Sequence, residues 1–231
     1  MRHFYNIGCV AAATTILMSL TGCGDIGYVP GADGPPMGVP QPATPPAPPE
    51  PPPPPPPPAV PPLSPTVVDL TDGPAIGTAR WPDPQTDGSP IGRFTCVFRP
   101  SSELSFHAHL SILVNNELQK VPLYLGASRQ PPTHCFYAIH THDASGRIHV
   151  TPAAPDTFTL GELFEIWGQP LSSTNVAGIT GLPVEIFVTD DGMTFKVEDT
   201  DWAGIELLPH REITIALGEP LREIPNFTWT D

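Results

Sequence analysis

The stretch FHAHLSIL, residues 106–113, decides the class of fold, because its polar and apolar residues alternate. A period of two predicts a β-strand, here over residues 107–114. Side chains two positions apart on a strand point to the same face, so we expect His107 and His109 to lie on one face. The chain is therefore expected to be built on a β-sheet.

Short branched runs separated by turn residues recur along the chain and predict further strands. These span residues 94–98, 136–142, 148–151, 184–189, 193–197 and 212–217. Asn115-Asn116 and Asp190-Asp191-Gly192 are plausible hairpin turns. The fold is predicted to be mainly β, as a β-sandwich or barrel-like sheet.

One segment, DTFTLGELFEIWG at residues 156–168, carries the signals of a short helix. Thr159 is a natural N-cap, and Glu162 three positions on completes a capping box. The apolar residues recur at helical spacing, and Gly168 can end the helix in the left-handed conformation. We expect one short packing helix over about residues 160–167, because an aromatic stripe of this kind is usually core.

The N-terminus, MRHFYNIGCVAAATTILMSLTGC at residues 1–23, is typical of a secretory signal. Its apolar run is shorter than the about 20 residues that a membrane-spanning helix needs. Leu-Thr-Gly-Cys at residues 20–23 resembles the lipobox of bacterial lipoproteins, whose cysteine is acylated, with palmitate among the usual chains. We predict a signal peptide over residues 1–22, cut before a lipidated Cys23; an ordinary signal peptide cut nearby is the alternative. The protein would then be lipid-anchored to a membrane of the bacterial cell envelope, facing the periplasm or the exterior.

Residues 23–66 are dominated by proline, with an unbroken run at residues 51–58. Proline donates no backbone hydrogen bond, so such a run takes up extended polyproline II and builds no core. We expect a disordered linker here, followed by one His-rich β domain over residues 67–231. A ligand for an aromatic-lined groove of a partner is the alternative role of the linker.

The chain is acidic, with 24 Asp and Glu against 10 Lys and Arg and a formal net charge of −14. Nucleic acids and anionic lipid surfaces attract basic proteins, so we expect neither as a direct partner. An acidic chain is compatible with attracting cations. The sequence points to no particular protein partner.

Cys96 and Cys135 are the cysteines that remain outside the signal peptide and the lipobox. In an oxidising compartment such a pair favours a disulfide, which would tie together the two segments that carry most histidines. Thiolate ligation of a metal is the alternative, but the sequence lacks the C-x-x-C spacing of such sites.

Five of the chain's eight histidines lie in two short stretches. In the second stretch, IHTHDASGRIHV, His140 and His142 share one face, and His149 follows the turn-like residues 143–146. A four-residue loop would place His140 opposite His149, with His142 opposite Arg147. A two-residue loop would instead pair His142 with His149. A three-residue loop would turn His149 to the other face.

Histidines at this spacing point to a divalent transition metal. Directly opposed residues have Cβ atoms about 4.5–5.5 Å apart, and two imidazoles can share one metal at about 2.0–2.1 Å each. Zinc and copper(II) suit imidazole, whereas soft copper(I) is disfavoured because no methionine or free cysteine lies near the motif. The expected ligands are His107, His109, His140, His142 and His149. The predicted function is metal holding, delivery or sensing.

Two other functions stay open. A metal-dependent hydrolase or lyase at the same cluster would need an open coordination position and a general base, for which Asp143 and Glu103 are the candidates. A surface interaction module would use the histidines as a purely structural network. For a metal site, Asp143, Thr141 and Thr151 are available by position to orient the imidazoles.

Three motifs occur in order along the chain: HAHLSILVNN, CFYAIHTHDASGRIHV and FTLGELFEIWGQPLS. As a set they resemble a family of uncharacterised bacterial exported proteins and lipoproteins. The similarity covers roughly residues 94–220 and leaves the proline-rich linker outside. The resemblance implies the domain boundaries and carries no established activity.

Overall fold

The architecture is that of a computed structural model, which describes residues 38, 59–71, 73–100, 103–129 and 134–229. The predicted signal peptide, Cys23 and most of the predicted linker lie outside these described residues.

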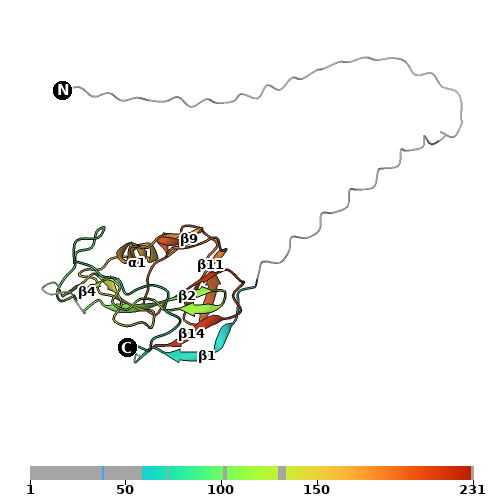
Figure 1. The fold of residues 1–231 in the computed structure, drawn as a ribbon. Coiled ribbons are helices and arrows are strands. Elements are labelled where there is room, and N and C mark those ends of the chain that lie inside the picture. Colours follow the sequence, from blue (N-terminus) through green and yellow to red (C-terminus); the bar gives the residue numbers. More distant parts are fainter. Residues whose placement is uncertain (1–37, 39–58, 72, 101–102, 130–133, 230–231) are drawn as a thin grey trace, which may run out of the picture. The chain divides into compact units, whose positions relative to one another are not determined.

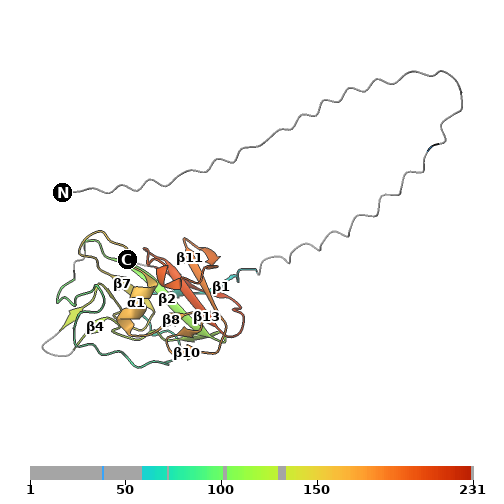
Figure 2. The same ribbon diagram turned by 90° about the horizontal axis from the view of Figure 1, so that it is seen from above.

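A seven-stranded sheet forms the centre of the domain (Figures 1 and 2). Its strands follow the order β12-β11-β13-β2-β7-β6, and the short β3 pairs with β2. Their bounds are β2 Phe106–Val114, β3 Glu117–Gln119, β6 Ile139–His140, β7 Arg147–Val150, β11 Val184–Asp190, β12 Met193–Lys196 and β13 Glu212–Leu217. Neighbours are antiparallel, except that β13 and β2 run parallel in the middle of the sheet. The prediction of a mainly β fold is confirmed.

Smaller sheets surround this one. In the two-stranded pair of β1 and β14 the strands run parallel, and Figure 1 shows them side by side. The bounds of the smaller elements are β1 Leu63–Asp69, β14 Ile224–Thr228, β4 Ala127–Ser128, β5 Cys135–Phe136, β8 Leu171–Ser172, β9 Asn175–Val176, β10 Ile179–Thr180 and a 3-10 helix at Trp202–Gly204.

The helix α1 spans Leu160–Trp167, as predicted. Thr159 caps it, and both hydrogen bonds of the capping box with Glu162 are present. Gly168 ends the helix at φ 70° in the left-handed region, which glycine adopts without a side-chain clash. The buried side of α1 joins the main core, so this is a packing helix.

The two faces of the seven-stranded sheet have different coverings. On one face, Leu110, Ile148 and Ile215 join α1 in the main hydrophobic core. On the other face, Leu113, Phe187 and Ala216 form a smaller cluster with two residues of the C-terminal segment, Leu221 and Ile224. We call this second side the β14 face. Because paired residues share a face, four of the predicted site histidines belong to it: His107 and His109 on β2, His140 on β6 and His149 on β7. His142 follows the end of β6.

Both predicted hairpin turns are confirmed. Asn115 and Asn116 link Val114 to its partner Glu117 with φ angles of 50° and 66°. The loop of Asp191 and Gly192 has φ angles of 49° and 77° and links β11 to β12. Two consecutive residues with positive φ form the turn whose twist matches that of the flanking strands.

Two predicted strands are wrong in extent. Over residues 94–98 there are only isolated bridges, because Val97 meets Phe136 at a single position. The segment 136–142 divides into β5 and β6, because the Tyr137 N–H turns away and donates to the Gly126 carbonyl at 2.9 Å. The fully buried Tyr137 ring holds this break in place.

The domain begins before residue 67, inside the range expected to be linker. Leu63 already pairs with Ile224 of β14. Pro65 lies in the irregular part of the pairing between Leu63 and Val67, where a missing N–H costs no ladder bond. A strand therefore begins in a segment whose proline-rich composition had predicted a linker.

Cys96 and Cys135 form the predicted disulfide, with Cα atoms 5.3 Å apart. It joins the loop before β2 to β5. Across the part of the chain that the structure describes, no helix is long and apolar enough to span a bilayer.

A four-histidine cluster as candidate functional site

Three histidines form a row across neighbouring strands. His107 on β2 is paired with His149 on β7, and His149 with His140 on β6. The Nε2 atom of His107 lies 3.0 Å from Nδ1 of His149. This register is the one expected for a four-residue loop at residues 143–146, and the two-residue and three-residue loops are excluded.

His142 joins the row from the start of that loop. Its Nε2 atom lies 2.9 Å from Nε2 of His140. Its ring stacks on that of His149, with centroids 4.2 Å apart and an interplanar angle of 16°. His107, His140, His142 and His149 thus form one group, which we call the four-histidine cluster.

His109 does not belong to this cluster, although it shares the β14 face with His107. Its Nε2 lies 2.8 Å from the Ser145 carbonyl oxygen, and its ring lies under Phe227 of β14 with centroids 3.9 Å apart. The residue is 1 % exposed. The C-terminal strand β14 therefore covers His109 but does not cover His107.

The Tyr137 carbonyl orients His140. Its oxygen lies 2.9 Å from Nδ1 of His140, and a carbonyl can only accept, so Nδ1 of the neutral ring carries the hydrogen. The lone pair of Nε2 then points to His142. In histidine metal sites, the ring nitrogen that does not bind the metal regularly donates to a carbonyl in this way, which fixes the orientation of the ring.

Burial favours the neutral form of three imidazoles of the cluster, those of His140, His142 and His149. Burial lowers the pKa of His140 to about 4, with repulsion from His142 and His107 as weaker causes. Burial and then repulsion from the neighbouring imidazoles lower the pKa of His149 further. Burial also lowers the pKa of the more exposed His142, although Asp143 opposes the shift. Neutral imidazole is the form that binds a metal.

Phe136 covers one side of the cluster. Its ring centroid lies 5.0 Å from that of His140 and 5.6 Å from that of His142. Because Cys135 precedes it in β5, the disulfide holds this aromatic cover in position.

The polar residues expected to assist the cluster are engaged elsewhere. Asp143 accepts the Ser145 N–H at 2.8 Å, and Thr141 donates to the Pro122 carbonyl at 2.9 Å. Thr151 donates to a carbonyl at 3.4 Å, and Glu103 is exposed. In the described residues, none of these side chains has a hydrogen bond to a cluster imidazole.

A metal would require the rings to turn. Within the described residues, no three His, Cys, Asp or Glu side chains are already arranged around one point as metal ligands. Two nitrogens bound to one ion lie roughly 2.9 Å apart at a right angle and roughly 3.4 Å apart at the tetrahedral angle. The 2.9 Å between His140 and His142 therefore matches the spacing of a right-angled pair, but their lone pairs must rotate to meet.

The site contains residues that sequence reasoning did not assign to it. Phe136 covers the imidazoles, the Tyr137 carbonyl orients one, and Arg147 is close enough to lower the pKa of His142 and His149 by repulsion. Only Arg147 had a signal in the sequence, since it lies two positions from His149 on a strand. The other two depend on the break between β5 and β6.

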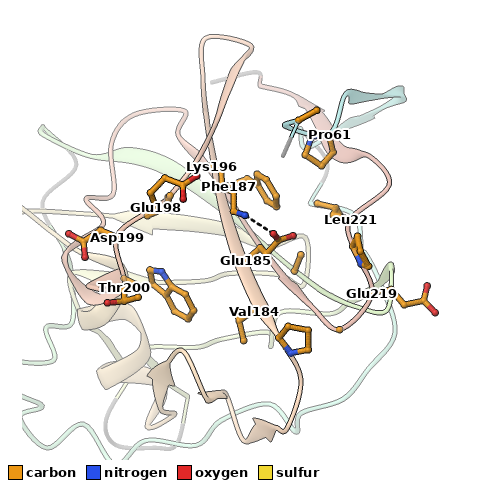
Figure 3. A pocket seen from close by; sticks show the side chains of 17 residues that line it. Pro61, Val184, Glu185, Phe187, Lys196, Glu198, Asp199, Thr200, Glu219 and Leu221 are labelled. Carbon is orange, nitrogen blue, oxygen red and sulfur yellow. Dashed lines mark hydrogen bonds and ion pairs between the residues drawn. The ribbon is translucent and has the colours of Figure 1, made fainter. Parts of the chain in front are cut away.

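A pocket of about 570 Å³ lies elsewhere on the domain, and no histidine lines it (Figure 3). Phe187 and Leu221 line it, together with the ion pair of Lys196 and Glu185 at 2.7 Å. Pro61, close to the start of β1, borders it. The candidate site is thus separate from this hollow.

Comparison with known proteins found no matching family model, no matching curated protein and no matching solved structure. The fold and the geometry of the cluster therefore carry the functional argument.

Proposed function

We propose that this protein is an envelope-anchored lipoprotein whose β domain binds a divalent transition metal, copper(II) or zinc, through the four-histidine cluster. The observation that supports it most is the orientation of His140, whose Nε2 lone pair is aimed at His142 by the Tyr137 carbonyl. His109, expected from the sequence to be a ligand, is left out because it is buried beneath Phe227.

In this proposal His140 and His142 bind the ion through their Nε2 atoms. The hydrogen on Nε2 of His142 would move to Nδ1, so no charged imidazole has to lose a proton. His149 is the third candidate, because its Nε2 is buried without a partner. When its Nδ1–H donates to His107, the Nε2 lone pair is available for the metal.

Isothermal titration of the chelator-treated, purified protein with copper(II), zinc and nickel tests this proposal. We expect at least one ion to bind with a dissociation constant below micromolar. The double variant His140→Ala/His142→Ala should abolish this binding, whereas His134→Ala, at an exposed histidine away from the cluster, should leave it unchanged. Binding of all three ions no tighter than micromolar, or equal binding by the double variant, would contradict the proposal.

A second test of the proposal uses copper(II) as the bound ion. Nitrogen hyperfine splitting in the electron paramagnetic resonance spectrum counts the bound imidazoles. We expect three or more nitrogens in the wild type and fewer in His149→Ala. An unchanged spectrum in that variant would remove His149 from the ligand set.

A purely structural histidine network is the second candidate. It is favoured by the two imidazole pairs at 3.0 and 2.9 Å, which satisfy each other without a metal. In that case His140→Ala should lower the unfolding free energy of the chelator-treated protein while the wild type binds no metal. A hydrolase or lyase at the cluster finds less support, since the carboxylate of Asp143 is engaged with Ser145.

Anchoring is tested separately at Cys23, which lies outside the described residues. Cys23→Ser should leave the protein without acyl chains and release it from the membrane fraction. If the variant fractionates with membranes and carries lipid like the wild type, the anchor proposal fails.

A further inference from the structure

Arg147 lies two positions before His149 on β7, so both side chains project from the β14 face of the sheet. Its guanidinium forms no hydrogen bond or ion pair with another described residue, and its Nε atom is buried without a partner. Buried N–H groups are normally hydrogen-bonded, because burial removes their bonds to water. Arg147 therefore presents an unused donor and a fixed positive charge beside the four-histidine cluster.

Within the described residues, no carboxylate forms an ion pair with Arg147. Across β2 it is paired with His109, whose imidazole carries no negative charge in either protonation state. His142, which lies opposite it by the register of the hairpin, is an imidazole too and cannot supply a negative charge. The nearest carboxylate in the loop, Asp143, accepts the Ser145 N–H and lies against Gly73 instead of forming an ion pair.

A second donor on the same face lacks a partner. The Nε2 atom of His149 is buried and has no hydrogen bond. When Nδ1 of His149 accepts from Nε2–H of His107, the His149 hydrogen sits on Nε2 and makes this atom a donor. In the metal-free protein Arg147 and His149 can then donate to one acceptor.

We propose that Arg147 and His149 bind a small oxyanion of the carboxylate or phosphate type. The edge of a guanidinium carries two parallel N–H groups whose spacing matches two oxygens of such an anion. His149 supplies a further N–H to it. In a chain with a net charge of −14, general attraction of anions is disfavoured, so these local donors must hold the ligand.

This site goes beyond the proposed metal function and does not require a metal. Arg147 is a poor metal ligand because its guanidinium stays protonated. The test is therefore made on chelator-treated protein, so that its failure and the failure of metal binding are separate results.

The experiment follows the arginine Nε–Hε signals of the purified protein by ¹H–¹⁵N nuclear magnetic resonance. Arg147→Lys assigns the signal of Arg147 by its loss. Inorganic phosphate and acetate are titrated at constant ionic strength, with chloride as the replacement salt. We expect a saturable shift of the Arg147 signal with phosphate, acetate or both. The anion that binds more tightly shows whether the site prefers a phosphate or a carboxylate.

Variants distinguish binding by the paired N–H groups of the guanidinium from attraction by its positive charge alone. By calorimetry, Arg147→Lys should weaken binding of the same anion by about tenfold or more, because lysine keeps the charge and loses the paired N–H groups. Arg99→Lys, the same change at an exposed arginine, is the matched control and should bind like the wild type. His149→Ala should weaken binding by a smaller factor.

Three results would overturn the proposal. One is the absence of a saturable shift up to millimolar anion. Another is an equal shift with chloride, which would indicate screening only. The third is equal affinity of Arg147→Lys and the wild type. Well-dispersed spectra of Arg147→Lys show that loss of binding is not loss of the fold.

Discussion

The ring of Phe227 lies against the ring of His109, with centroids 3.9 Å apart, and so joins the C-terminal strand to the centre of the sheet. This contact separates His109 from the other imidazoles of its face. Besides Ile224 in the smaller core cluster, β14 thus contributes the buried ring of Phe227, which is 7 % exposed, to the packing of this face.

Phe227→Ala should therefore lower the unfolding free energy by about 3–5 kcal/mol, as expected when a buried aromatic ring is removed. Urea denaturation measures this change. The same variant should raise the pKa of His109 toward its ordinary value, because water reaches the ring; a proton resonance titration detects it. Phe98→Ala, at a side chain that is 67 % exposed, is the control and should change stability by less than about 0.5 kcal/mol. An equal loss in both variants would contradict the role of Phe227.

The buried imidazoles should make the domain sensitive to acid. The folded-state pKa values of His109 and His140 are lowered to about 4 from an unfolded value of 6.5. Below pH 6.5 the unfolded chain binds more protons than the folded one, so stability is lost as the pH falls from 6.5 toward 4. Each of these two residues contributes on the order of 3 kcal/mol to that loss. Urea midpoints measured from pH 7.5 to 4.5 check this, and a flat profile over that range would refute it.

Glu212 should have the opposite dependence. Burial raises its pKa from 4.5 to about 7, although the hydrogen bond from Trp229 opposes the shift. The folded state then binds the extra proton between pH 4.5 and 7, so this residue makes stability fall as the pH rises through that window. Glu212→Gln keeps an acceptor for Trp229 and should stabilise the protein at pH 8 by up to about 3 kcal/mol.

The pH window of Glu212, 4.5 to 7, overlaps that of the histidines, so in the wild type Glu212 offsets part of the stability that the imidazoles add as the pH rises. In Glu212→Gln the rise of stability between pH 4.5 and 7 should be steeper than in the wild type, because this offset is removed. Denaturation curves of both proteins, measured on the same pH series, test this prediction. An equally steep rise in both proteins would contradict the raised pKa of Glu212.

Removing the disulfide should destabilise the domain and loosen the cover of the cluster. Cys96 and Cys135 are 39 residues apart, and closing such a loop contributes roughly 4 kcal/mol. The double variant Cys96→Ala/Cys135→Ala should lose about that much on urea denaturation. It should also shift the ring proton resonances of His140 and His142, because Phe136 is no longer tethered. Unchanged histidine resonances would show that the disulfide does not hold the cover of the cluster in position.

Local signals in the sequence predicted several elements correctly. The capping box of Thr159 and Glu162, with Gly168 at the other end, located α1 because each of these signals acts within a few residues. The alternation of residues 106–113 located β2 for the same reason, and Asp191-Gly192 located the hairpin of β11 and β12. The disulfide was predicted because Cys96 and Cys135 are the cysteines that remain outside the signal peptide and the lipobox.

The sequence by itself thus predicted the mainly β class, the short helix, the disulfide, and that His107 shares a face with His109 and His140 with His142. Tertiary structure alone decided which of them meet. His107, His149 and His140 form a row because β2, β7 and β6 are neighbours in that order, whereas His109 is withdrawn under Phe227. The strand that covers it pairs with β1 across about 160 residues of chain, and such long-range pairing leaves no periodic signal in either segment.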